Sequence, residues 1–298
     1  MAPRSEGAYL IVNADDYGYF RCVSKGILKA ATQGIVTATG VLSNAADFAE
    51  HAARLRDCEA LDVGVHLNLT DGAPLTTELR NRLSRWSGRF PGKFAMVGAI
   101  LSRSVRTEDV SREWRAQIER CLDHGLHVRF LNSHEHLHML PSLFAVTRAL
   151  AKDYEIRHIR FPTSQLIGSS SNGSLFRGAV IKALQMLNGR HARTPRARFL
   201  GLETSGKLDL PYLQRSLSRL AAGEIYELMC HPGEFDAREV TDARLPRYHD
   251  WEGELATLTS PAARELLHRR GIRLIGYRDL EIRGDRLAVR QETALAGD

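Results

Sequence analysis

The sequence contains the stretch Tyr9-Leu10-Ile11-Val12-Asn13-Ala14-Asp15-Asp16. The apolar run at its start predicts a short strand, and the strand leads directly into polar and acidic residues. A helical pattern follows at 24–33 and is terminated by Gly34, a residue type that often ends helices. This stretch therefore predicts a strand–loop–helix unit whose loop carries two carboxylates.

The same unit recurs along the chain. Strands are predicted at 9–12, 35–42, 63–69, 128–131, 158–161, 198–202, 225–230 and 273–276. Helices are predicted at 24–33, 47–56, 107–124, 141–153, 179–187, 210–221 and 262–270. Alternation of about eight strands with helices indicates an α/β fold, a distorted (β/α) TIM-like barrel with a parallel sheet.

We expect one domain over residues 1–298, because no clean linker or shorter repeat divides the chain. The core should span about 9–280. Two stretches break the rhythm and are predicted to be inserted loops. The first, about 72–105, is rich in Gly and Pro. The second, about 162–205, has a Ser/Gly patch and a basic run, and we expect it to form a lid over the site.

Composition excludes several classes of protein. The net charge of +6 comes from basic residues interspersed with acidic ones, without the basic and aromatic pattern of nucleic-acid grooves, so no nucleic acid partner is expected. No apolar run approaches the length of a membrane span or a signal sequence. The 4 cysteines lack CxxC spacing and are expected to be reduced thiols in a cytoplasmic protein. A homodimer is left open.

Polar side chains gather where the predicted strands end. Sites in parallel α/β folds form at the carboxyl ends of the strands, so these side chains should converge. They are Asp15 and Asp16 after the first strand, His66 near the end of the third, His134, His136 and His138 after the fourth, Arg160 at the end of the fifth, and His231 after a later strand.

The two acidic residues are expected to differ in role. Adjacent side chains on extended backbone point to opposite sides, so one carboxylate can bind a metal while the other stays free as a base. An ordinary turn or helix cap is the alternative for an isolated Asp-Asp pair. His66 would share a strand face with Asn68. A role for His66 as a metal ligand is favoured because further imidazoles and a carboxylate are expected at the same site.

The densest cluster is Asn132-Ser133-His134-Glu135-His136-Leu137-His138-Met139. Its three histidines alternate, so on an extended backbone they would project to one side. A metal or substrate site is favoured over a polar surface loop. The spacing does not decide which of the three histidines binds a metal.

These residues together resemble a known family, the YdjC-like carbohydrate deacetylases, which include the chitooligosaccharide deacetylases. The resemblance covers about residues 9–280 and rests on five motifs in order. They are Leu10-Ile11-Val12-Asn13-Ala14-Asp15-Asp16-Tyr17-Gly18, Gly34-Ile35-Val36-Thr37-Ala38-Thr39, Gly64-Val65-His66-Leu67, Ser133-His134-Glu135-His136-Leu137-His138-Met139 and Glu227-Leu228-Met229-Cys230-His231-Pro232.

The resemblance implies a hydrolase that removes an N-acetyl group from an amino sugar with one divalent metal, zinc or magnesium. By motif, Asp16, His66 and His134 would bind the metal, Asp15 would be the general base and His231 the general acid. Contacts with the N-acetylated sugar are expected from the remaining polar residues, His136, His138, Arg160 and Asn68. For Arg160 a structural salt bridge is an equal alternative.

Two positions depart from the family pattern. Asn132 stands where an Asp is usual, and Glu135 stands where a His is usual. Asn132 cannot supply a charge, so an orienting role for a carboxylate at that position would be weakened. Two other functions stay open. One is a metal-dependent phosphoesterase in which His136 and His138 bind extra metals, and the other is a non-catalytic carbohydrate-binding protein.

Overall fold

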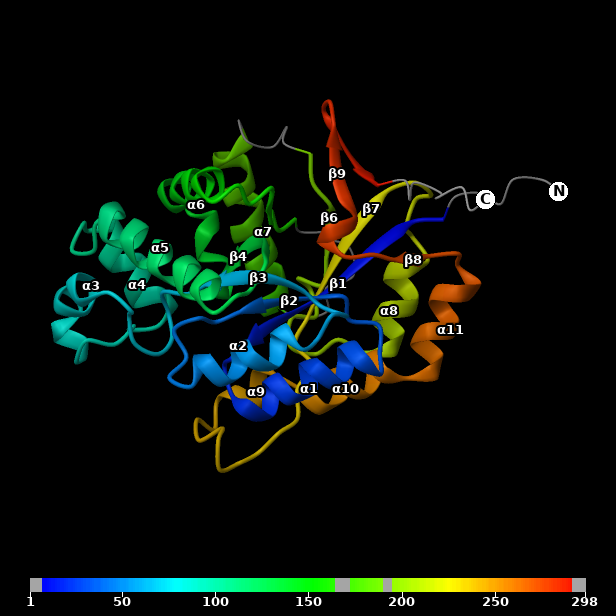
Figure 1. Ribbon diagram of the computed structural model, residues 1–298, viewed down its shortest axis with the longest axis horizontal. Coiled ribbons are helices and arrows are strands. Elements are labelled where there is room, and N and C mark those ends of the chain that lie inside the picture. The colour runs from blue at the N-terminus through cyan, green and yellow to red at the C-terminus, as the bar shows by residue number, and fades with distance from the viewer. Residues whose placement is uncertain (1–6, 164–171, 190–194, 291–298) are drawn as a thin grey trace.

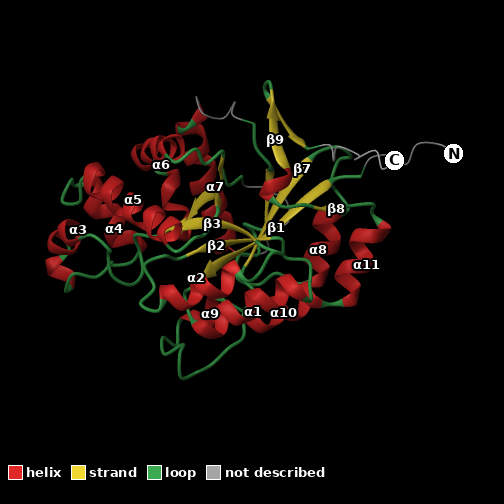
Figure 2. Ribbon diagram, viewed as in Figure 1, coloured by secondary structure: helices red, strands yellow, loops and turns green. Residues whose placement is uncertain are grey.

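The computed structural model describes residues 7–163, 172–189 and 195–290. A parallel sheet lies at its centre and helices surround the sheet (Figures 1 and 2). Each of the eight predicted strands is confirmed, and a hairpin is added after them. The strands are β1 Tyr9–Tyr17, β2 Ala38–Val41, β3 Asp62–Leu67, β4 Val128–Ser133, β5 His158–Ile159, β6 Arg198–Leu200, β7 Ile225–Cys230, β8 Arg273–Leu274, β9 Leu280–Arg283 and β10 Arg286–Val289.

The strand order explains how the sheet curls. The order is β5-β4-β3-β2-β1-β7-β6, and β8 pairs with β1 alongside this path. β7 runs directly beside β1 from Tyr9 to Ala14, whereas β8 pairs only with Tyr9 and Leu10. Within the described residues no ladder joins β5 to β6, so the sheet is a curled half-barrel. The predicted distorted barrel is confirmed in this open form.

Helices cover the outside of the sheet. α1 contacts β1 and lies beside α10, α5 contacts β3 and β4, and α6 contacts β5 (Figure 1). The helix predicted at 107–124 is confirmed as α5, and its apolar side chains Val110, Trp114, Ile118 and Cys121, which recur at helical spacing, are all buried. The helices are α1 Arg21–Thr32, α2 Phe48–Arg56, α3 Thr77–Arg82, α4 Lys93–Leu101, α5 Thr107–Asp123, α6 Pro141–Asp153, α7 Asn172–Leu187, α8 Leu210–Leu217, α9 Leu245–Tyr248, α10 Trp251–Thr259 and α11 Pro261–Arg269.

The stretch 72–105 is more ordered than its sequence predicts. It contains α3, a 3₁₀ turn at Ser84–Trp86 and α4, where only a loop was expected. Glycine and proline at its turns hid these short helices. The buried carboxylate of Glu113 on α5 holds the stretch in place, because it accepts hydrogen bonds from the backbone N–H groups of Leu75 (3.0 Å) and Thr76 (2.9 Å).

The stretch 162–205 lies partly outside the described residues. Positions 164–171 and 190–194, which include much of the Ser/Gly patch and the basic residues Arg190 and Arg193, are among those not described. The expected lid therefore stays a prediction. Within the described ranges, every helix is too short or too polar to cross a bilayer. Cys22, Cys58, Cys121 and Cys230 form no disulfides, as expected.

Glu113→Ala should lower the free energy of unfolding by about 3 kcal/mol, because several buried donors would lose their acceptor. Urea unfolding measures this loss, and proteolysis within 72–105 should accelerate. Glu108→Ala, an exposed position on the same helix, is the matched control and should change little. Equal effects of the two substitutions would contradict the proposed anchoring of the stretch.

Candidate metal and catalytic site

The site begins at an irregularity near the end of β1. The ladder between β1 and β2 shifts register between Ala14 and Tyr17, and Asp16 adopts a positive φ of 70°. This bulge separates the two neighbouring carboxylates. Asp15 faces Arg160, whereas Asp16 faces His66 and His134. The two side chains thus diverge as expected, but Asp15 is paired with Arg160 and is not free.

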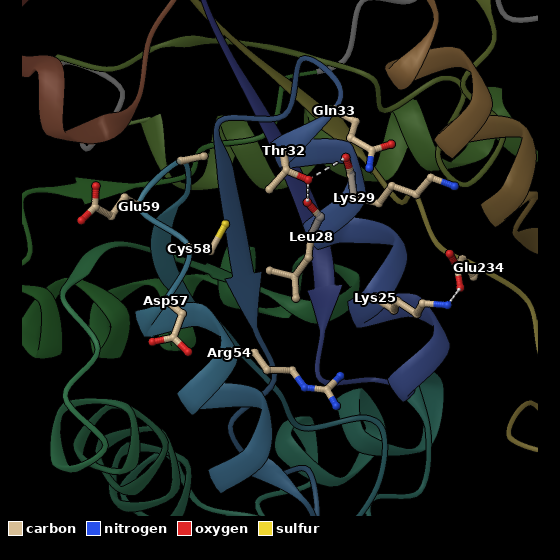
Figure 3. A pocket seen from close by; sticks show the side chains of 11 residues that line it. Lys25, Leu28, Lys29, Thr32, Gln33, Arg54, Asp57, Cys58, Glu59 and Glu234 are labelled. Atoms are coloured by element: carbon tan, nitrogen blue, oxygen red, sulfur yellow. Dashed lines mark hydrogen bonds and ion pairs between the residues drawn. The ribbon is translucent and has the colours of Figure 1, made fainter.

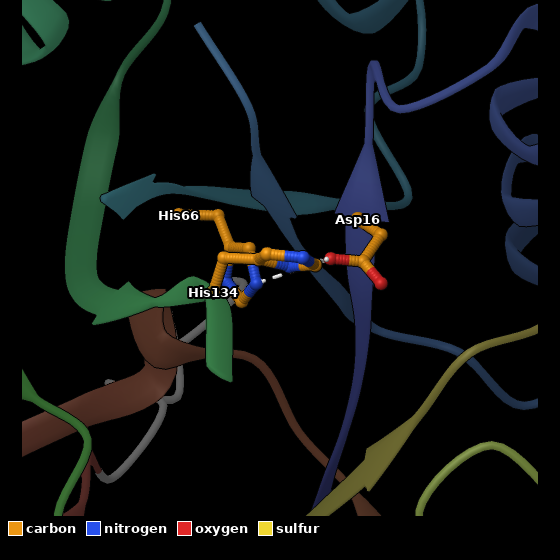
Figure 4. Close-up of side chains that lie close together, drawn as sticks. All are labelled: Asp16, His66 and His134. Carbon is orange, nitrogen blue, oxygen red and sulfur yellow. Dashed lines mark hydrogen bonds and ion pairs between the residues drawn. The ribbon is translucent and has the colours of Figure 1, made fainter. Parts of the chain in front are cut away.

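Three side chains meet at this point (Figure 4). Oδ1 of Asp16 lies 2.7 Å from Nδ1 of His134 and 3.2 Å from Nε2 of His66. One ligand atom from each residue lies within 4.8 Å of the others. In the described part of the chain, this is the one group of His, Cys, Asp and Glu side chains that comes together in this way.

The chemistry of these donors fits a divalent cation. Burial alone would raise the pKa of Asp16, but His134 and His66 hold it well below its ordinary value. Burial alone would lower the pKa of His134, but Asp16 raises it to about 9. The centre thus attracts positive charge. Two imidazole nitrogens and one carboxylate oxygen also leave coordination positions open, as catalytic metal sites do.

The histidine cluster after β4 is a left-handed turn, which corrects the expected extended backbone. Glu135 and His136 have φ values of 55° and 58°. The turn directs His134 to the metal centre and sends His138 into the interior. Glu135 forms an ion pair with Lys93 of α4 (2.9 Å), which joins the stretch 72–105 to the edge of the site.

His138 serves the structure of the turn. Its ring is fully buried, Nε2–H donates to the backbone carbonyl of Arg160 (2.9 Å), and Nδ1 accepts from the Ser133 hydroxyl (2.6 Å). Both ring nitrogens are occupied, which argues against the predicted substrate contact. The His136 ring packs edge-on against Phe199, with ring centroids 5.9 Å apart.

Arg160 is part of a buried ion-pair network. Its guanidinium donates to both oxygens of Asp15, with Nη2 2.9 Å from Oδ1, and Nε donates to Oε1 of Glu227 at 2.6 Å. Its side chain has an exposed fraction of 0%. The structure thus shows the salt bridge that was the alternative for Arg160, and the burial of the side chain argues against a contact with substrate.

Asn68 also has a structural role. Its Oδ1 accepts from the backbone N–H groups of Thr70 (2.9 Å) and Asp71 (3.2 Å). Its Nδ2 donates to Asn44 Oδ1 (3.0 Å) and to the Asp71 carbonyl (2.9 Å). The side chain stabilises the turn after β3, and this use of its polar atoms argues against the predicted contact with substrate.

Asp15 is held in its ionised form. Burial alone would raise the pKa of this carboxyl, but the charges of Arg160 and His66 lower it to about 2. Oδ1 also accepts a hydrogen bond from Nδ2 of Asn132 at 3.0 Å. The carboxylate is therefore charged and oriented at neutral pH.

His231 follows β7 directly. Its backbone N–H donates to Oε2 of Glu254 on α10, and its ring lies 5.3 Å from the ring of His249, centroid to centroid. Burial lowers the pKa of His231, although Asp16 and Asp15 oppose the effect. Burial also raises the pKa of Glu254 to about 8. Sequence reasoning missed Glu254, His249 and Glu227, although an acidic residue within the apolar strand β7 was a signal for Glu227.

Comparison with known proteins places the chain in a family. A family model described as YdjC-like protein matches residues 9–269. The chain belongs to the YdjC-like family. The carbohydrate deacetylase of Geobacillus stearothermophilus is 32% identical over 281 residues, covering 91% of this chain and 97% of the relative. The chitooligosaccharide deacetylase of Klebsiella pneumoniae strain 342 is 31% identical, covering 91% and 98%.

A solved structure supports the fold of this YdjC-like chain. The crystal structure of the “putative cellobiose-phosphate cleavage protein” of Enterococcus faecalis V583 matches with a TM-score of 0.72 and 27% identity, covering 92% of this chain and 98% of that one. The two chains thus share one fold over nearly their full lengths.

A surface groove lies at the other end of the sheet (Figure 3). It is lined by the carboxyl-terminal part of α1 and by the residues that follow α2, which lead into the first residues of β3. Lys25 at its rim pairs with Glu234 at 2.7 Å. None of the predicted site residues lines the groove, so it is separate from the candidate site.

Stability should fall on mild acidification because His138 is buried as a neutral ring. Burial, reinforced by the charge of Arg160, lowers the pKa of His138 to about 3 in the folded protein, against 6.5 ordinarily. Between these values the unfolded chain binds the extra proton. His138 should therefore contribute a loss of up to about 1.4 kcal/mol per pH unit as pH falls below about 6.5.

Urea unfolding of metal-free protein between about pH 6.5 and pH 5 measures this loss. His138→Gln should show a shallower dependence on pH than the unsubstituted chain. His268→Gln, at an exposed position on α11, should leave the slope unchanged. Parallel curves for His138→Gln and the unsubstituted protein would rule out the buried neutral ring as a source of the acid sensitivity.

Proposed function

We propose that this chain is a metal-dependent deacetylase that removes the acetyl group from the nitrogen of an amino sugar. The observation that carries the proposal is the Asp16, His66 and His134 cluster beside an ionised Asp15 at the carboxyl ends of the strands. The family and its relatives named carbohydrate deacetylases support the same reaction.

The metal would be one divalent ion held by Asp16, His66 and His134. When bound, it would supply a Lewis acid that makes water more acidic and polarises the acyl carbonyl. Two imidazole ligands favour zinc over magnesium, because magnesium prefers an all-oxygen shell.

The reduced cysteines support a cytoplasmic location.

Asp15 would act as the general base at one of its carboxylate oxygens. Arg160 and Asn132 hold the group in a single orientation, so the proton of the attacking water has a fixed acceptor. A pKa of about 2 keeps Asp15 ionised at neutral pH. The same low pKa makes it a weak base, so it depends on an acidified water as the proton donor.

His231 would be the general acid. An amine leaves readily only when its nitrogen is protonated, so a donor is needed on the side of the leaving group. Burial lowers the pKa of the His231 ring, so at neutral pH the ring must first gain a proton before it can donate one to the leaving nitrogen. The charges of Asp16 and Asp15 raise this pKa and so favour the protonated ring. Asp15 and His231 come from the ends of adjacent strands, β1 and β7, and the charges of Asp16 and Asp15 act on the His231 ring, which supports a shared site.

The phosphoesterase alternative is weakened by the histidine turn. That reading needs His138 as a ligand of an additional metal, and both of its ring nitrogens are hydrogen-bonded within the fold. A count of one metal per chain supports the deacetylase proposal, whereas two or three would favour the phosphoesterase.

Substitutions separate the metal ligands from the base. His66→Ala and His134→Ala should lose bound metal and activity together, because each removes one of three ligands. Asp15→Asn should keep the metal but lower turnover by about 10² to 10⁴, the usual contribution of a general base. Elemental analysis and acetate release measure the two effects, and near-normal turnover of Asp15→Asn would dismiss the base assignment.

Acetate release also tests the substrate. The panel would contain N-acetylated free oligosaccharides, nucleotide-linked sugars and lipid-linked sugars, each with and without a chelator. We expect acetate that the chelator abolishes from one of these classes. Protein that carries metal but releases no acetate from any of them would contradict the proposed reaction and favour the phosphoesterase.

A further inference from the structure

Asn132 occupies the centre of the site without reaching its surface. It is fully buried and pairs with His66 across the ladder between β4 and β3. Its Oδ1 lies 2.7 Å from Nδ1 of His66, and its Nδ2 lies 3.0 Å from Oδ1 of Asp15. The carboxamide therefore links a proposed metal ligand to the proposed base.

Gly40 of β2 makes room for this link. A Cβ at that position would lie 3.0 Å from Oδ1 of Asn132 and 3.1 Å from Nδ1 of His66. A side chain there would press on both ends of the hydrogen bond. Three neighbouring strands thus contribute to one buried contact.

The direction of these hydrogen bonds follows from Arg160. Its guanidinium keeps Asp15 ionised, and an ionised carboxylate can only accept hydrogen bonds. The Asn132 atom facing Asp15 must therefore be the amide nitrogen, which leaves the amide oxygen facing His66. An amide oxygen only accepts, so Nδ1 of His66 must carry the hydrogen.

We propose that Asn132 is a positioning residue that transmits the charge of Asp15 to the tautomer of His66. The proposal rests on the roles proposed above for these two residues. With hydrogen held on Nδ1, Nε2 is the His66 atom that can present a lone pair to a metal, and it faces Oδ1 of Asp16 at 3.2 Å. In metal-free protein these two atoms can share a proton, which a bound cation would replace.

Charge explains why an amide suits this position. The guanidinium of Arg160 already pairs with two buried carboxylates, Asp15 and Glu227. A carboxylate at position 132 could accept from His66 but would face Asp15 with like charge. Buried charges without partners are costly, so the neutral amide keeps the link and avoids a third negative charge.

The tautomer can be read directly by ¹⁵N NMR of the imidazoles in metal-free protein. We expect Nδ1 of His66 to carry hydrogen in the unsubstituted protein. Asn132→Leu removes both hydrogen bonds and should abolish this preference, with metal affinity about 10- to 100-fold weaker. Asn132→Asp keeps an acceptor toward His66, so it should retain the Nδ1–H form.

Asn188→Leu is the matched control. Asn188 is also a buried amide, and its Nδ2 donates to the backbone carbonyl of Met139 at 2.8 Å. Its loss should reduce stability without changing the His66 tautomer or the metal affinity.

A His66 ring without hydrogen on Nδ1 in the unsubstituted protein would overturn the proposal, whether or not the Asn132 variants fold. So would unchanged tautomer and affinity in Asn132→Leu. Both measurements are independent of turnover, so they stand even if no sugar is deacetylated.

Discussion

The buried guanidinium of Arg160 is the interaction on which the site depends. It follows β5, one edge of the open sheet, and pairs with Asp15 of β1 and Glu227 of β7. Four strands, β4, β3, β2 and β1, lie between β5 and β7 in the sheet. Arg160 can therefore reach Glu227 only because the sheet curls. Removing the guanidinium would leave two buried carboxylates without their shared partner, which is strongly destabilising.

This ion pair also separates the tasks of two neighbouring carboxylates. Asp15 is committed to Arg160, and the bulge in β1 turns Asp16 away toward the imidazoles. One acid is therefore kept charged and oriented by a guanidinium, and the other is kept charged by histidines. The proposed chemistry needs one carboxylate to bind the metal and another to accept a proton, and two adjacent residues supply them.

The turn after β4 completes the arrangement. Its left-handed residues, Glu135 and His136, allow His134 to reach Asp16 while His138 turns inward to hold the backbone near Arg160. Histidines that look equivalent in the sequence thus have different functions. One faces the metal centre and another stabilises the loop that presents it.

The sequence by itself determined the strands and the strand-end location of the site, and the order of its motifs, matched to a family, singled out Asp16, His66 and His134. These depend on local patterns, apolar periodicity and motif order, which are visible along the chain. Only the tertiary structure decided the roles of Arg160, His138 and Asn132, because hydrogen-bond partners far apart in sequence set them. It also showed helices within 72–105, whose order depends on a buried carboxylate of α5 that no local pattern reveals.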